Sequence, residues 1–136
     1  MKNLSVYLVF NGRCREAFNF YQSVCGGDLT FTHYGDFPAN GSDAEADKTH
    51  VMNASLIINE NTSILGCDTP AKSGGPTFGN NFHVMLNTST KEEADQLFVK
   101  LSENGTVQMP MAQQFWGAYF GMCIDQFDVQ WMIAYG

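Results

Sequence analysis

The stretch Val6-Tyr-Leu-Val-Phe10 and the segment Arg13 to Cys25 decide the fold, because their pattern returns about 77 residues later. In the first copy, the apolar run leads into Ala17, Phe20, Tyr21 and Val24 and then Gly26-Gly27. In the second copy, His83 to Leu86 leads into Ala94, Leu97, Phe98 and Leu101 and then Asn104-Gly105. The spacing i, i+3, i+4, i+7 predicts one apolar helix face, and the glycine or asparagine that follows suits a helix end.

Short apolar segments around these helices complete two βαβββ modules. Strands are expected near 4–10, 29–34, 50–58 and 62–67, and again near 81–87, 106–110, 118–124 and 129–134. Thr90 and Glu93 form a capping box that begins the second helix. We therefore predict an α+β protein of one domain, with modules at 1–67 and 80–136 joined by a linker at 68–79. Because each module opens with a strand that is apolar on both faces, we expect two curved half-sheets around a cavity.

The composition of the chain limits the kinds of molecule and surface that it is expected to bind. The chain has 136 residues, a formal charge of −7 and only seven lysines and arginines, which argues against binding to nucleic acid or to an anionic membrane surface. Its start does not resemble an export signal, and no apolar run is long enough to span a bilayer. The four scattered cysteines are expected to be free thiols, and the cytoplasm is the expected compartment.

Motifs at both ends of the chain resemble one protein family. They are Tyr7-Leu8-x-Phe10-Asn11-Gly12-x-Cys14-x-Glu16-Ala17-x-x-Phe20-Tyr21, then Phe115-Trp116-Gly117-x-x-x-Gly121 and Asp125-x-Phe127-x-x-x-Trp131-Met132. The chain is similar to the PhnB-like branch of the vicinal oxygen chelate superfamily, often described as "3-demethylubiquinone-9 3-methyltransferase-like". The resemblance implies a glyoxalase/bleomycin-resistance-like fold and commonly a homodimer.

The superfamily's metal-dependent enzymes take a ligand, usually His or Glu, from the first and the last strand of each module. At the matching positions this chain has His83, but also Val6 and, where Glu would stand, Met132. A thioether is a poor ligand for hard or borderline divalent ions, so we expect no metal and no cofactor. Recruitment of Cys67, Asp68 or His50 to a shifted metal site is an alternative. His83 is interpreted as a hydrogen-bonded imidazole in a cavity wall, or else as a ligand contact or an acid/base group.

Strand alternation predicts which side chains line the cavity. Val6, Leu8, His83, Met85 and Met132 are expected to face it, with Tyr7, Val9, Val84, Leu86, Trp131 and Ile133 facing the helices. Asn53 stands where this branch often has His, and it can orient a polar ligand group without moving a proton. Phe115 and Trp116 either close the core or stack on a flat ligand.

These expectations define a leading hypothesis and two alternatives. The leading hypothesis is a metal-independent protein that binds a small apolar or aromatic molecule in the central cavity. The alternatives are a metal-dependent isomerase, lyase or dioxygenase with non-standard ligands, and a subunit whose cavity is simply packed. Catalytic residues are unassigned. The residues do not support methyl transfer, because the sequence has no glycine-rich strand-to-helix loop followed by an acidic residue.

Overall fold

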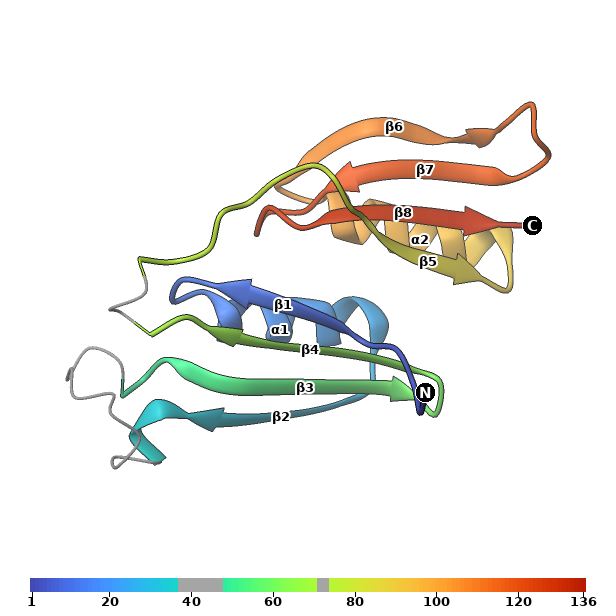
Figure 1. Ribbon diagram of the computed structural model, residues 1–136. Coiled ribbons are helices and arrows are strands. Elements are labelled where there is room, and N and C mark those ends of the chain that lie inside the picture. Colours follow the sequence, from blue (N-terminus) through green and yellow to red (C-terminus); the bar gives the residue numbers. More distant parts are fainter. Residues whose placement is uncertain (37–47, 71–73) are drawn as a thin grey trace. The chain divides into compact units, whose positions relative to one another are not determined.

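The computed structural model describes residues 1–36, 48–70 and 74–136, so the acidic stretch at 43–47 lies outside it. The chain divides into unit 1 (Met1–Thr77) and unit 2 (Phe78–Gly136). Unit 1 contains β1 (Val6–Phe10), α1 (Cys14–Cys25), β2 (Asp28–His33), the short 3-10 helix η1 (Tyr34–Asp36), β3 (Val51–Asn59) and β4 (Thr62–Asp68). Unit 2 contains β5 (Val84–Thr88), α2 (Lys91–Ser102), β6 (Thr106–Gln113), β7 (Tyr119–Ile124) and β8 (Gln130–Tyr135) (Figure 1). The predicted α+β fold with two βαβββ repeats is confirmed.

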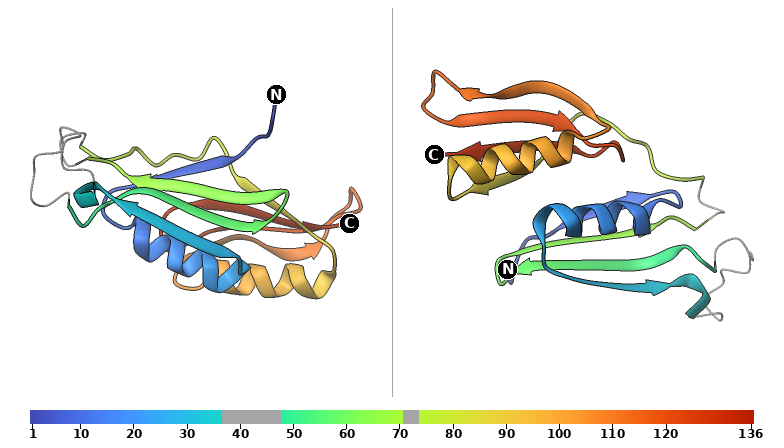
Figure 2. Two further views of the ribbon diagram at one scale, coloured as in Figure 1. Left: turned by 90° about the horizontal axis from the view of Figure 1, so that it is seen from below. Right: turned by 180° about the vertical axis from the view of Figure 1, so that it is seen from behind.

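Each unit builds one four-stranded mixed sheet with the same strand order. Unit 1 has the order β1-β4-β3-β2, and unit 2 has β5-β8-β7-β6. The first strand of each unit pairs in parallel with the last, whereas the other neighbours are antiparallel. In each unit the helix covers one face of its own sheet (Figure 2). Neither helix in the described residues is long and apolar enough to cross a membrane.

The helix α1 packs through a stripe that contains Phe18 in place of the predicted Phe20 and gains Cys14. Its buried residues are Cys14, Ala17, Phe18, Tyr21 and Val24. Phe18 is fully buried, whereas Phe20, which was expected in the stripe, is only half-buried. The cysteine at position 14 acts as a small apolar residue, and it lies on the same helix face as Phe18, one turn away. The ring of Phe18 fills the space above Gly66 of β4, where a Cβ atom would lie 2.6 Å from that ring.

The helix α2 begins as the sequence predicts. The side chain of Thr90 accepts a hydrogen bond from the Glu93 backbone N–H at 3.1 Å. Glu93 Oε1 in turn accepts one from the backbone N–H of Ser89, the residue before the cap, at 3.0 Å, so the side chains of Thr90 and Glu93 both bond to the backbone at this helix start. After the helix, Asn104 adopts a positive φ of 58°. The predicted start and stop of this helix are confirmed.

Candidate functional site

Contacts between α2 and β7 establish which side chains of the second sheet face the helix. The hydroxyl of Tyr119 donates to Asp95 Oδ1 at 2.5 Å, and Lys91 Nζ lies 4.8 Å from the centre of the Tyr119 ring. Both partners belong to α2. Because successive strand residues point to opposite faces, Phe120, Met122 and Ile124 face away from α2. We call this side of the sheet the distal face of unit 2.

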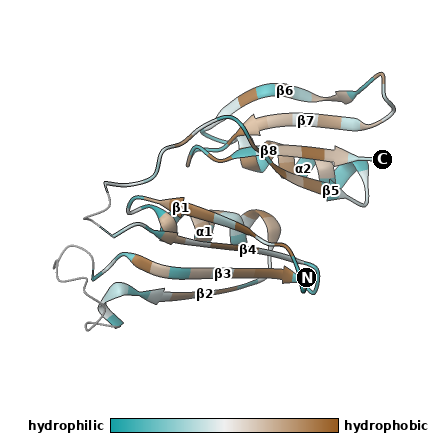
Figure 3. Cartoon of the chain, viewed as in Figure 1, coloured by the Kyte–Doolittle hydropathy of each residue, from teal (hydrophilic) through white to brown (hydrophobic). Residues whose placement is uncertain are grey.

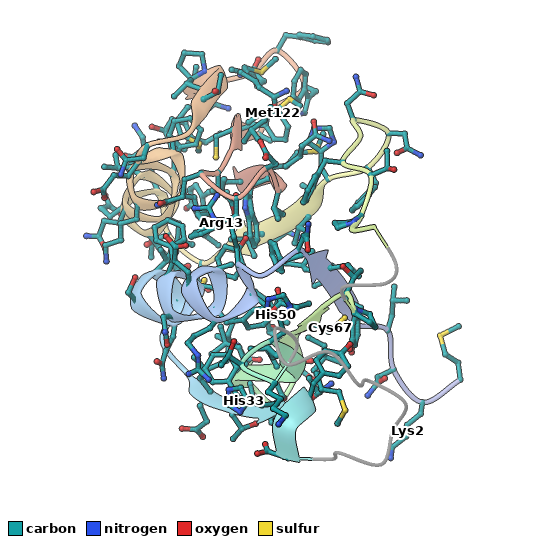
Figure 4. All side chains as sticks on the ribbon, turned by 90° about the vertical axis from the view of Figure 1, so that its left-hand side faces the viewer. Lys2, Arg13, His33, His50, Cys67 and Met122 are labelled. Carbon is teal, nitrogen blue, oxygen red and sulfur yellow. The ribbon has the colours of Figure 1, made fainter. Side chains whose placement is uncertain are left out.

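A row of methionines crosses the distal face of unit 2, with one on each strand. Met85 of β5 pairs with Met132 of β8, which pairs with Met122 of β7, which pairs with Met109 of β6. Met85 is 49% exposed and Met109 is 36% exposed. Figure 3 shows hydrophobic residues along much of β7 and β8, and Figure 4 labels Met122. Paired residues of neighbouring strands share a face at about 5 Å, so Met85, Met132 and Met122 form one continuous surface. Met109 extends it onto β6, whose register shifts on both sides of this residue, and we call the four residues the methionine row.

Aromatic side chains flank one side of the methionine row. Phe120 stands two residues from Met122 on the same face of β7. The Trp116 ring packs edge-on against Phe120, with centroids 5.8 Å apart, and Phe115 packs on Trp116 at 5.0 Å. The hairpin loop that carries them is held by a 2.8 Å hydrogen bond from Gln113 Nε2 to the Gly117 carbonyl. Trp116 therefore lies beside the distal face, whereas Phe115 is 97% exposed at the loop tip.

Polar groups flank the other side of the row. An open pocket of about 420 Å³ lies there, lined by Phe78, Gly79, Asn80, Ile124, Asp128 and Gln130. Gln130 Nε2 donates to the carbonyls of Gly79 and Phe82 at 2.8 and 3.1 Å, which ties the segment before β5 to β8. His83 immediately precedes β5, and its Nε2 is buried without a hydrogen-bond partner among the described residues. The sequence indicated neither Gln130 nor Asp128 as pocket residues.

The orientation expected for β1 was wrong. The Phe10 ring contacts the Phe18 ring of α1 with centroids 6.4 Å apart, so alternation turns Val6 and Leu8 toward α1 as well. Leu8 is only 5% exposed, whereas Tyr7 is 48% exposed. Because β1 is apolar at every position, its sequence carried no alternation signal from which the correct face could be read. Tyr7 and Val9, and not Val6 and Leu8, therefore belong to the face of the first sheet that lies opposite α1, the distal face of unit 1.

Tyr7, Asn53 and Cys67 form a small polar cluster on the distal face of unit 1. The Tyr7 hydroxyl lies within interaction range of the side chains of Asn53 and Cys67. Burial raises the pKa of the Tyr7 phenol above its ordinary value, and burial also raises the pKa of the Cys67 thiol, against the opposite effect of its interaction with Tyr7. Both groups are therefore neutral near pH 7 and can orient a ligand by hydrogen bonds. Cys67, labelled in Figure 4, is a weak nucleophile in this state.

Two carboxyl groups that are buried in the described part of the chain, those of Asp68 and Asp125, are hydrogen-bonded to N–H groups of the protein. Asp68 Oδ1 accepts from the backbone N–H groups of Gly12 and Cys14 at 2.8 and 3.0 Å, and Oδ2 accepts from Val51 at 3.0 Å. The three N–H bonds hold Asp68 at the start of α1, although the sequence offered it as an alternative metal ligand. Within the part of the chain that the structure describes, no three His, Cys, Asp or Glu residues are grouped to hold a metal ion. Among the described residues, His83 and the thioether of Met132 do not make a donor set that suits the divalent ions of the superfamily's enzymes.

Asp125 explains the motif at the end of the chain. Its Oδ1 accepts from the backbone N–H groups of Phe127 and Val129 at 2.8 and 3.1 Å, and its Oδ2 accepts from Trp131 Nε1 at 2.8 Å. Asp128 has a positive φ of 67° in the same turn. The motif residues Asp125, Phe127 and Trp131 therefore build the turn between β7 and β8, which sets the register that aligns Met122 with Met132.

Comparisons with known proteins place this architecture in a family. The sequence model of the family described as "3-demethylubiquinone-9 3-methyltransferase" matches residues 2–134. Protein YjdN of Escherichia coli (strain K12) is 31% identical over 136 residues, which cover 96% of this chain and 92% of YjdN. The crystal structure of protein PA1353 from Pseudomonas aeruginosa is 36% identical with a TM-score of 0.86, covering 99% of this chain and 98% of that one.

A second solved structure is a putative 3-demethylubiquinone-9 3-methyltransferase, PhnB protein, from Bacillus cereus. It is 24% identical with a TM-score of 0.78 and covers 99% of this chain and 100% of that one. A glyoxalase/bleomycin resistance protein/dioxygenase family enzyme from Burkholderia phytofirmans shares the fold at 17% identity, with a TM-score of 0.64 and coverage of 96% and 95%. The chain belongs to the 3-demethylubiquinone-9 3-methyltransferase family, a PhnB-like family with the glyoxalase/bleomycin-resistance fold.

Proposed function

We propose that this protein binds a small apolar or aromatic molecule on the distal face of unit 2 and that it does so without a divalent metal. The observation that carries the proposal is the alignment of Met85, Met132, Met122 and Met109 in one row, with Trp116 and Phe120 beside it. Thioether side chains are flexible and polarisable, so they adapt to ligands of different shape and make favourable contacts with aromatic rings.

The size of the row suits a compact ligand. A planar molecule that removes on the order of 100 Å² of apolar surface on each partner gains roughly 5 kcal/mol from burial. The loss of translational freedom offsets part of that gain, so polar contacts must add to the affinity. Asn80 of the pocket offers an amide, and His83, which precedes β5, offers an imidazole nitrogen for one or two hydrogen bonds. These features support a ligand with an apolar body and one polar end.

Catalysis is not part of the proposal. Metal-dependent chemistry would need a set of donors that fits a divalent ion, and the carboxylates of Asp68 and Asp125 are bound to backbone and indole N–H groups. The thiol of Cys67 is protonated near neutral pH, since burial raises its pKa. The polar cluster of Tyr7, Asn53 and Cys67 is assigned a hydrogen-bonding role within unit 1, and Asn53 is not part of the proposed site on unit 2.

A thermal-shift screen tests the proposal. Aromatic and apolar metabolites are added to the protein with EDTA, and a binding molecule raises Tm because it binds only the folded state. We expect the same rise in Tm with EDTA and with added Zn²⁺. We expect Met122→Gln, which places an amide in the middle of the row, and Trp116→Ala to weaken binding by about tenfold, equivalent to roughly 1.4 kcal/mol.

The matched control for these variants is Val99→Gln. Val99 is 67% exposed and lies on α2, so it belongs to the opposite side of the sheet. This variant keeps the wild-type affinity if the distal face is the site. A Tm rise that disappears with EDTA and returns with Zn²⁺ would favour the metal-dependent enzyme instead. Equal affinity in Met122→Gln, Trp116→Ala and the wild type would remove the methionine row from the site.

A further inference from the structure

Two of the four row methionines lie on the strands that adjoin His83, whose Nε2 has no hydrogen-bond partner among the described residues. Met85 and Met132 are direct neighbours in the parallel pair of β5 and β8. His83 stands two residues before Met85, and the alternation of β5 carried back by one residue places it on the same face. Cross-strand neighbours lie about 5 Å apart and positions i and i+2 about 7 Å apart, so three long side chains can meet above this corner of the sheet.

We propose that His83, Met85 and Met132 bind a soft monovalent cation of the Cu(I) or Ag(I) class. The inference goes beyond the proposed function, because the ligand is a metal ion and the test uses that ion alone. The donors are one imidazole nitrogen and two thioether sulfurs, all uncharged. Thioethers favour soft cations over hard or borderline divalent ions, and imidazole accepts metals of both kinds. The same chemistry that excludes a divalent enzyme site at Met132 therefore favours a soft one.

The state of His83 gives the independent support. Its Nε2 is buried and has no hydrogen-bond partner among the described residues, although the residue as a whole is half-buried. A buried polar atom without a partner destabilises the fold, and a ligand or a proton donor that reaches the atom removes this penalty. The neutral imidazole presents a lone pair, and a cation held by the two thioethers would satisfy it.

Cysteine thiols compete with thioethers for such a cation, and the structure lowers the metal affinity of two of these thiols. Cys123 is fully buried, it pairs with Trp131 on the α2 side of the sheet, and burial raises its pKa to about 12. Burial also raises the pKa of Cys67, so at neutral pH both carry their protons. Because the thiolate is the form that binds metal, these two groups bind a soft cation less strongly at pH 7 than ordinary cysteines would.

The test is a titration with Ag(I), which needs no reductant, followed on the methionine methyl groups by NMR. Cys25 and Cys67 are first replaced by serine, which removes the two thiols that are only half-buried. We expect about one cation per chain to shift the methyl signals of Met85 and Met132 and the Nε2 signal of one histidine. The signal of Met109, two strands from Met132 in the same row, stays in place.

Variants separate a built site from loose association with sulfur. Met85→Leu, Met132→Leu and His83→Gln are each expected to lower the Ag(I) affinity by about tenfold or more. Met109→Leu removes a thioether from the same row and keeps the affinity within about twofold. Unchanged melting curves establish that each variant folds. Unmoved methyl signals of Met85 and Met132, equal shifts at Met109, or full affinity in both Met85→Leu and Met132→Leu would overturn the proposal.

Discussion

Single buried carboxylates hold the turns and helix ends on which the distal faces depend. Asp68 and Asp125 are each 2% exposed, and each accepts hydrogen bonds from three N–H groups. Hydrogen bonds to a charged acceptor are stronger than neutral ones, and they replace the water that the carboxylate lost. The two residues are therefore structural, although carboxylates in such a superfamily invite a catalytic interpretation.

The first prediction concerns Asp125. We expect Asp125→Asn to lower the free energy of unfolding by about 2–3 kcal/mol. The new NH₂ group is a donor, and it would face an N–H group that now donates to an Asp125 oxygen. Urea denaturation measures the change. The control is Asp128→Asn in the same turn, since Asp128 is exposed and asparagine also tolerates its φ of 67°. An equal loss of unfolding free energy in both variants would contradict the prediction, because the buried carboxylate would then contribute no more than an exposed residue of the same turn.

At the scale of secondary-structure elements, one close approach is repeated in both units. A Cβ atom on Gly27 would lie 2.5 Å from the Ile57 carbonyl oxygen of β3, and one on Gly105 would lie 2.1 Å from the Ile124 carbonyl oxygen of β7. Each glycine follows its helix and lets the next strand begin directly beside its antiparallel neighbour. The atom that is met is backbone, which has little freedom to move away. The repeat of the sequence is therefore a repeat of backbone packing as well.

The second prediction follows from this contact. Gly105→Ala is expected to lower the free energy of unfolding by about 2–4 kcal/mol, since the new methyl group overlaps a carbonyl oxygen. Gly26→Ala serves as the control, because a Cβ there meets no atom within 4 Å and only its φ of 73° is unfavourable. That control should lose about 1 kcal/mol. Thermal or urea unfolding checks the order, and an equal loss in the two variants would refute the steric explanation.

At the scale of the whole molecule, each unit buries a thiol whose ionisation is suppressed. Cys14 in unit 1 and Cys123 in unit 2 are both fully buried. Burial raises the pKa of Cys14 well above its usual range and raises the pKa of Cys123 from 9.0 to about 12. Nearby carboxylates, Asp68 and Asp125 respectively, act in the same direction as burial. The folded chain therefore keeps protons that the unfolded chain releases at lower pH.

The third prediction is a loss of stability in alkaline solution. Below pH 9 both states hold these protons and stability is unaffected, whereas between pH 9 and about 12 only the folded Cys123 keeps its proton. The free energy of unfolding should fall by up to about 1.4 kcal/mol per pH unit for each thiol. Cys123→Ala should make this slope shallower. Val129→Ala, another core truncation, should lower stability without changing the slope, and a parallel decline in all three proteins would assign the effect to other groups.

Several features of this protein could be read from residues alone. The helix spacing, the Thr90–Glu93 cap and the short apolar segments determined two βαβββ repeats, because these signals are local and depend on backbone preference and period. The expectation of no divalent metal has an equally local basis, the sulfur of Met132, and it stays a prediction.

The tertiary structure alone decided which faces and which neighbours those residues have. The direction of β1 depends on the contact of Phe10 with Phe18, since a strand that is apolar on both sides carries no alternation. The methionine row depends on the pairing of four strands, which brings Met85 beside residues as distant in sequence as Met132. Register arises from long-range hydrogen bonds and from the Asp125 turn, and a linear pattern of residues does not encode it position by position.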